Sequence, residues 1–216
     1  TYHGAGCDLG SIDVAHRHNL TVIVDESHGS HFCFDHRLPR SAVEAGADVV
    51  VHSTHKTLGS LTQTGLLHLA TGRVEREQMA EVLSMLQSTS PSYLLMASLD
   101  AMRADLAEKG SEIVGHTVDL ALNLRAAISN IPGFYCGDLS SPHGYDTTKI
   151  LLQSSFMNGL ELGKALRLDY KIYPELEEES FVLLMITVGD TQAGIERLIT
   201  ALRDISSKHG GEIKEK

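Results

Sequence analysis

The chain of 216 residues carries 18 lysine and arginine residues against 28 aspartate and glutamate residues, which gives a net charge of −10. A surface of this charge disfavours nucleic acid and anionic membranes as partners, because both would repel it. No apolar run reaches about 18 residues, so we expect no membrane-spanning helix. The length allows one large domain or two small ones.

The three cysteines, Cys7, Cys33 and Cys136, lie far apart and form no C-x-x-C pair. An odd number of separated cysteines indicates a reducing compartment, and we predict a cytoplasmic protein without structural disulfides. The chain opens at Thr1 without an initiator methionine or a targeting segment. We therefore expect an N-terminally truncated form of a longer protein.

Helix and strand patterns alternate along the first half of the chain. The predicted elements are strands at 20–24, 48–51 and 65–69 and helices at 11–18, 41–46 and 73–87. The strands are continuous apolar and β-branched runs, which are typical of strands buried on both faces of a parallel sheet. Short connections between such elements predict an open, mostly parallel α/β sheet with flanking helices.

The second half of the chain has a different organisation. Helices are predicted at 90–106, 111–129, 158–168 and 191–206, and strands at 149–152 and 181–187. The last four of these elements alternate strand and helix and have their own turn residues, which predicts a small α+β domain. We thus expect three parts: a large domain at 1–105, a connecting helix at 106–136 and the small domain at 137–216.

Chemistry-bearing side chains follow two of the predicted strands directly. Asp25 follows the first strand, and Lys56 follows the second with Ser53 and His55 before it. Ligands of open α/β sheets bind at the carboxyl ends of the strands, so these side chains converge if the two strands are neighbours. A lysine, phosphate-binding polar groups and an acidic partner for a ring nitrogen are together what pyridoxal phosphate requires.

Each residue alone has a plainer interpretation. Asp25 is typical of a turn or helix cap, and Lys56 of a solvated surface. His28 and His31 are three residues apart, but without a helix or a third ligand they predict no metal site. Residues 25–28 also fit a D-E-x-H nucleotide-hydrolysis motif, which requires an upstream phosphate loop that this sequence lacks.

The segment STHKTLGSLTQT at 53–64 resembles the cofactor-attachment segment of the Orn/Lys/Arg decarboxylases. Further segments that look like the same family lie at 25–32, 90–93, 97–100, 144–149 and 188–191. The resemblance implies a fold-type-I, pyridoxal-phosphate-dependent lyase of polyamine metabolism that decarboxylates arginine, lysine or ornithine. It also implies that 1–105 are the C-terminal part of the cofactor-binding domain and that the protein is a homodimer or higher oligomer.

Carried over to this sequence, the resemblance implies that Lys56 forms the internal aldimine and that Asp25 pairs with the pyridine nitrogen. Ser53 and His55 would contact the cofactor phosphate. Ser27 would lie against one face of the ring, where the family usually has alanine.

Two further positions follow from the same resemblance. His28 would line the pocket near the reacting atoms as a second catalytic residue, and Thr1 would lie in the loop that approaches the phenolic oxygen of the ring. Glu175 is a candidate contact for the distal cation of a basic substrate, although a solvated surface glutamate is an equally good interpretation.

The segments by which the family binds most of the phosphate and stacks on the ring are absent from this sequence. We therefore keep open that a second chain supplies an N-terminal half, or that the chain is a catalytically incomplete fragment, pseudoenzyme or partner subunit. A third alternative is a fold-type-I aminotransferase, which would need a small-domain arginine for the substrate carboxylate. Arg167 is the one candidate ahead of the last helix.

Overall fold

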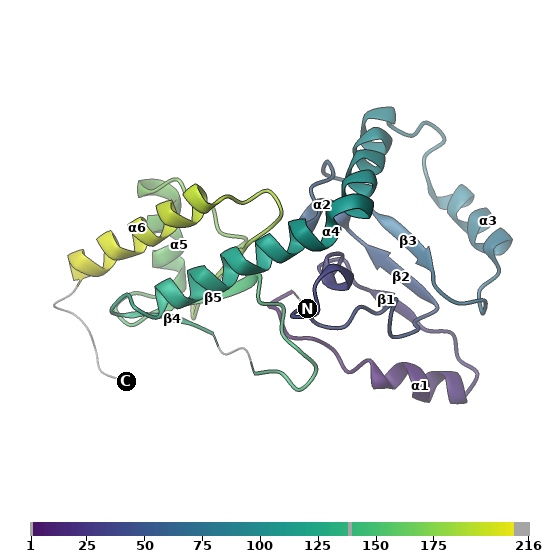
Figure 1. Cartoon of the computed structure of the whole chain (residues 1–216), viewed down its shortest axis with the longest axis horizontal. Coiled ribbons are helices and arrows are strands. Elements are labelled where there is room, and N and C mark those ends of the chain that lie inside the picture. The colour runs from purple at the N-terminus through teal and green to yellow at the C-terminus, as the bar shows by residue number, and fades with distance from the viewer. Residues whose placement is uncertain (1, 138–139, 210–216) are drawn as a thin grey trace. The chain divides into compact units, whose positions relative to one another are not determined.

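The structure, a computed structural model, describes residues 2–137 and 140–209 of the chain (Figure 1). Contacts divide the chain into two units, Thr1–Val114 with Ser141–Tyr145, and Gly115–Ser140 with Asp146–Lys216. Helix α4, Tyr93–Ile128, contributes residues to both. The sequence predicts two helices here, and the non-helical backbone of Lys109 (φ −134°, ψ 16°) does divide α4 into two helices at a kink. The three-part division at 105 and 136 stays a prediction.

The first unit contains a three-stranded sheet of order β1-β2-β3 (Figure 1). Its strands are β1 at Ile23–Asp25, β2 at Val49–His52 and β3 at Leu66–Leu69. β1 and β2 pair in parallel, as their apolar, β-branched sequences predict, whereas β3 pairs antiparallel to β2. The parallel pair places the carboxyl ends of β1 and β2 at one edge of the sheet.

Helix α1, Gly10–Arg17, buries Ile12 in a small core with Ala42, Ala47 and Val50. The helix predicted at 41–46 is wrong, because the structure has turns at 42–46. Gly46 ends the segment after a single turn with a positive φ of 88°, a conformation that glycine adopts without strain. Helix α3, Arg76–Leu86, has no buried residue.

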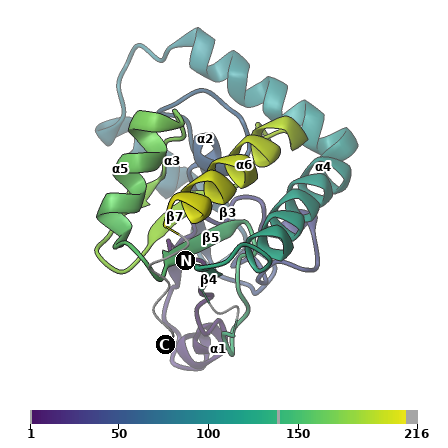
Figure 2. The same cartoon turned by 90° about the vertical axis from the view of Figure 1, so that its left-hand side faces the viewer.

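The second unit contains a four-stranded antiparallel sheet of order β4-β5-β7-β6. The strands are β4 at Phe134–Cys136, β5 at Lys149–Ser154, β6 at Leu176–Glu177 and β7 at Val182–Met185. Helices α5, Gly159–Asp169, and α6, Gln192–His209, lie over β5 and β7 (Figure 2). Fully buried leucine and isoleucine side chains from α4, β5, α5 and α6 form the core between these elements.

The sequence does not predict β4 or β6, because three- and two-residue strands are too short to show an alternating pattern. Helix α5 begins where the sequence predicts it. The side chain of Asn158 accepts a hydrogen bond from the backbone N–H of Glu161, and the Glu161 carboxylate accepts one from the N–H of Asn158. Among the described residues, no helix combines the length and the apolar character that crossing a membrane requires.

Candidate active site

The parallel pairing of β1 and β2 brings together the two segments that the sequence singles out. Asp25 is the last residue of β1, and its Cα is paired with that of Val51 on β2. β2 ends one residue later, and Ser53 precedes the one-turn helix α2 at Thr54–Thr57, which carries Lys56. Asp25 and Lys56, which are 31 residues apart in sequence, therefore lie at the same edge of the sheet.

Lys56 lies beside a histidine at this edge. Its Nζ is 3.1 Å from Nε2 of His28, and both side chains are half-buried. The His28 ring also makes an edge-to-face contact with Tyr2, with 4.6 Å between the ring centroids. A protonated Lys56 donates a hydrogen bond to His28 in this arrangement, so the histidine lies where it can exchange a proton with the amine.

Asp25 is held by its near neighbour Ser27. Oδ1 of Asp25 accepts hydrogen bonds from the backbone N–H of Ser27 at 2.9 Å and from its hydroxyl at 2.5 Å. These two bonds, and to a smaller extent the nearby Lys56 and His28, lower the pKa of Asp25 below its usual value of 3.8. Among the described residues, no group donates a hydrogen bond to Oδ2, so the ionised carboxylate has an oxygen available for a cationic partner.

His55 is oriented by the loop that follows α2. Its Nδ1 donates a hydrogen bond to the carbonyl oxygen of Thr64 at 2.6 Å, which leaves Nε2 for another group. The same loop is tied to α2 by buried hydroxyls: Ser60 Oγ donates to Thr54 Oγ1 at 2.8 Å, and Thr64 Oγ1 donates to the carbonyl of Leu61 at 2.6 Å. The sequence analysis did not identify these positioning hydroxyls, which a short run of serine and threonine after a lysine could have indicated.

The other residues that the sequence analysis names as candidate site residues lie in different environments. Thr1 lies outside the described residues. The hydroxyl of Ser27, which the resemblance places against one face of a cofactor ring, is bonded to Asp25. Arg167 is ion-paired with Glu177 within the second unit, and Glu175 is exposed. In the described part of the chain, no three His, Cys, Asp or Glu side chains are grouped as a metal site would need.

The donor set at this edge matches the needs of pyridoxal phosphate. Lys56 offers an amine for an aldehyde, and Asp25 offers an ionised carboxylate for a pyridinium nitrogen. Ser53 and His55 offer polar hydrogens to a phosphate from the segment directly before the lysine. These residues fit the group in type and in shared position at the strand ends.

The sequence matches the family described as "Orn/Lys/Arg decarboxylase, major domain" over residues 1–151. The chain belongs to the Orn/Lys/Arg decarboxylase family. This confirms the resemblance drawn from the segment around Lys56. An arginine decarboxylase of Bacillus subtilis is 39% identical over an alignment 216 positions long, which covers 96% of this chain and 44% of that protein.

Solved structures extend the likeness to the fold. A lysine decarboxylase of Francisella novicida superposes with a TM-score of 0.82 at 20% identity, over 98% of this chain and 36% of that one. A phosphoserine aminotransferase of Cytophaga hutchinsonii superposes with a TM-score of 0.66 at 16% identity, over 94% of this chain and 60% of that one. The predicted fold class is thereby confirmed: the family member described here has part of the fold-type-I α/β fold followed by a small α+β unit. It spans about half the length of the curated relatives it matches.

Proposed function

We propose that this chain is part of a pyridoxal-phosphate-dependent decarboxylase of basic amino acids. The observation that carries the proposal is the position of Lys56, whose amine lies 3.1 Å from His28 at the strand edge that also carries Asp25. Family membership supports the substrate class, because the family description names ornithine, lysine and arginine. Which of the three is used is left to experiment.

In this proposal Lys56 is the residue that holds the cofactor covalently, and Ser53 and His55 bind its phosphate. When bound, pyridoxal phosphate supplies an electron-accepting ring that stabilises the charge left on the substrate α-carbon as CO2 departs. Asp25 keeps a proton on the ring nitrogen, since its lowered pKa keeps the carboxylate ionised. Ser27 positions Asp25 through its two hydrogen bonds.

His28 is proposed as the second catalytic residue. Its Nε2 accepts the proton that the Lys56 ammonium must lose before the amine attacks an aldehyde carbon. The edge-to-face contact with Tyr2 restricts the tilt of the imidazole and keeps Nε2 directed at the amine. Thr1 stays a proposed cofactor contact next to Tyr2.

The partner assignments are proposals as well. A basic amino acid is the proposed substrate, with Glu175 as a candidate for its distal cation, and a homodimer or higher oligomer is the proposed assembly. A second chain that supplies an N-terminal half would complete the phosphate site. The aminotransferase alternative is not favoured, because the guanidinium of Arg167 is already ion-paired with Glu177.

The test is a visible-absorption titration of the purified chain with pyridoxal phosphate, comparing wild type with Lys56→Ala and with Lys164→Ala as an exposed-lysine control. We expect a saturable cofactor band in the wild type and the control that is lost in Lys56→Ala. Assays of CO2 release from L-arginine, L-lysine and L-ornithine then identify the substrate. An equal band in all three proteins, or none in any, would contradict the assignment of Lys56.

A further inference from the structure

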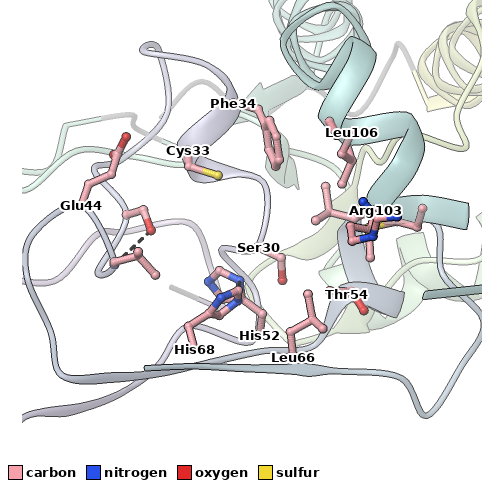
Figure 3. Close-up of a pocket in the computed structure, with 15 residues that line it drawn as sticks. Ser30, Cys33, Phe34, Glu44, His52, Thr54, Leu66, His68, Arg103 and Leu106 are labelled. Carbon is pink, nitrogen blue, oxygen red and sulfur yellow. Dashed lines mark hydrogen bonds between the residues drawn. The ribbon is translucent and has the colours of Figure 1, made fainter. Parts of the chain in front are cut away.

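A cavity of about 340 Å³ lies in the first unit, and neither Lys56 nor Asp25 lines it (Figure 3). Its walls come from the 3-10 turn η1 at Phe32–Phe34, from β2 and β3, and from α4. The apolar lining includes Phe34, Leu58, Leu66, Met102 and Leu106. Pockets for small molecules have volumes of about 300–1,000 Å³, so this cavity has room for a small ligand.

Ser30 gives the cavity wall an unsatisfied polar group. The residue is 2% exposed, and its hydroxyl has no hydrogen-bond partner among the described residues. Buried hydroxyls are nearly always hydrogen-bonded, because leaving one without a partner loses the bonds that water would have made. A ligand with one polar group in this cavity would satisfy the Ser30 hydroxyl.

Two histidines in the wall are fixed by a buried network. Oε2 of Glu26 lies 2.8 Å from Nε2 of His52, which must donate because a carboxylate only accepts. Nδ1 of His52 lies 3.0 Å from Nε2 of His68, so a hydrogen bond between the two rings extends the network into the cavity wall. Burial and the neighbouring His52 lower the pKa of His68 below 6.5, so the His68 ring is neutral near pH 7.

No charged group in the described wall offers a ligand an unpaired buried charge. Glu26 accepts hydrogen bonds from Ser41 Oγ, the N–H of Ala42 and His52. Arg103 is exposed and ion-paired with Asp100. Glu44, which also borders the cavity, is exposed to solvent. A charged ligand would lose its hydration here without gaining a buried counter-charge, whereas a neutral one would not.

We propose that this cavity binds a small, neutral, aromatic molecule that places one hydroxyl group against Ser30. The flat ring system packs between Phe34, Leu66 and Leu106, and the hydroxyl makes the hydrogen bond that Ser30 lacks. A hydroxyl suits this partner because it can both donate and accept. The site is independent of the proposed cofactor chemistry, since no cofactor-binding residue enters it.

The test uses 2-naphthol as the probe and naphthalene, which has the same rings without the hydroxyl, as its control. The chain contains no tryptophan, so the fluorescence of either probe is measured without interference from that residue. Binding is titrated to the full chain in the absence of pyridoxal phosphate. We expect 2-naphthol to bind saturably and about three- to tenfold more tightly than naphthalene, as one hydrogen bond provides.

Three variants locate the binding. Ser30→Ala should weaken 2-naphthol binding about three- to tenfold and leave naphthalene binding unchanged. Ala107→Phe, at an exposed α4 position that borders the cavity, should block both probes, and Ser84→Ala on α3 should change neither. Circular dichroism checks that each variant folds. If a variant does not fold, the comparison of the two probes in the wild type still tests the proposal.

Any of three results would overturn the proposal. The first is that 2-naphthol does not bind saturably, and the second is that both probes bind the wild type with equal affinity. The third is that folded Ser30→Ala or Ala107→Phe binds the probes as the wild type does. None of these results affects the cofactor titration of Lys56→Ala, so failure of this site and failure of the proposed function are distinguishable.

Discussion

Nζ of Lys56 lies 3.1 Å from Nε2 of His28, although the two residues are carried by different segments that follow β2 and β1. The parallel pairing of these strands brings them together, because it places both segments at one edge of the sheet. An amine in this position has a base within hydrogen-bond distance and a carboxylate, Asp25, nearby. This geometry supports the proposal that Lys56 attaches an aldehyde covalently.

His28→Asn tests the first consequence of this contact. Asparagine preserves a polar side chain but cannot take up a proton at neutral pH, so Lys56 would lose the base that we propose for it. We expect the rate at which pyridoxal phosphate attaches to fall about 100-fold, the lower end of general-base effects, while the final amplitude of the band is retained. Stopped-flow absorption measures both quantities.

His18→Asn is the matched control, because His18 is exposed at the end of α1. It should attach the cofactor at the wild-type rate. Attachment by His28→Asn at that same rate would show that the 3.1 Å contact has no kinetic role.

Ser27→Ala tests the hydrogen bonds that hold Asp25. The hydroxyl and the N–H of Ser27 stabilise the charged carboxylate, so removing the hydroxyl should raise the pKa of Asp25 toward 3.8. The N–H bond and the charges of Lys56 and His28 remain, so the pKa should still lie below that value. The chemical shift of the Asp25 carboxyl carbon, followed by NMR through an acid titration, reports the change.

Ser84→Ala, distant in sequence and exposed, should leave the Asp25 titration unchanged. A Ser27→Ala variant whose Asp25 titrates as in the wild type would show that the hydroxyl does not contribute and would assign the lowered pKa to the backbone N–H bond and the surrounding charges. Because Asp25 is exposed, we expect no measurable loss of stability in either variant.

The strand edge with its lysine could be predicted from the sequence because two runs of β-branched residues each end in a polar segment. The network of Glu26, His52 and His68 could not. Glu26 follows Asp25 directly, and adjacent residues point to different sides of the backbone, so sequence order does not show which carboxylate is buried. Glu26 is 4% exposed, whereas its neighbour Asp25 is open to solvent.

Local patterns also misled at short elements. Ser41 resembles a helix N-cap, and its carbonyl does accept one helical bond from Ala45, but Gly46 ends the segment after that turn. The hydroxyl of Ser41 accepts a hydrogen bond from the N–H of Val43 at 3.2 Å, as an N-cap does, and it also donates one to the buried Glu26. The capping bond follows from the local pattern, whereas the contact with a residue 15 positions earlier does not.

Asp48 should be a principal stabilising residue of the first unit. It is fully buried and accepts hydrogen bonds from the hydroxyl of Thr71, from the N–H of Val22 and from His16. Burial alone would raise the pKa of Asp48, but these bonds outweigh it and lower the pKa below 3.8. We expect Asp48→Asn to lower the free energy of unfolding at pH 7 by about 3 kcal/mol, as for other broken buried networks. Urea titration measures this.

The pH dependence gives a second check on Asp48. A carboxylate with a lowered pKa stabilises the folded state above its unfolded value of 3.8, and this contribution is lost as the pH falls through the folded value. Asp48→Asn should therefore approach wild-type stability in acid. Asp13→Asn, an exposed control on α1, should match the wild type throughout. An equal stability deficit at all pH values would contradict the role of the charge.

His68 should make the first unit less stable in mild acid. Burial, reinforced by the neighbouring His52, lowers the pKa of His68 below 6.5. Above pH 6.5 both the folded and the unfolded chain hold His68 neutral. Between that value and the folded pKa only the unfolded chain binds the proton, so the free energy of unfolding falls by at most about 1.4 kcal/mol per pH unit.

His68→Gln should remove this part of the pH dependence, whereas His18→Gln, at an exposed position, should retain it. Urea titrations between pH 7 and about pH 5 compare the three proteins. Equal slopes in wild type and His68→Gln would show that the half-buried His68 ring does not have a lowered pKa.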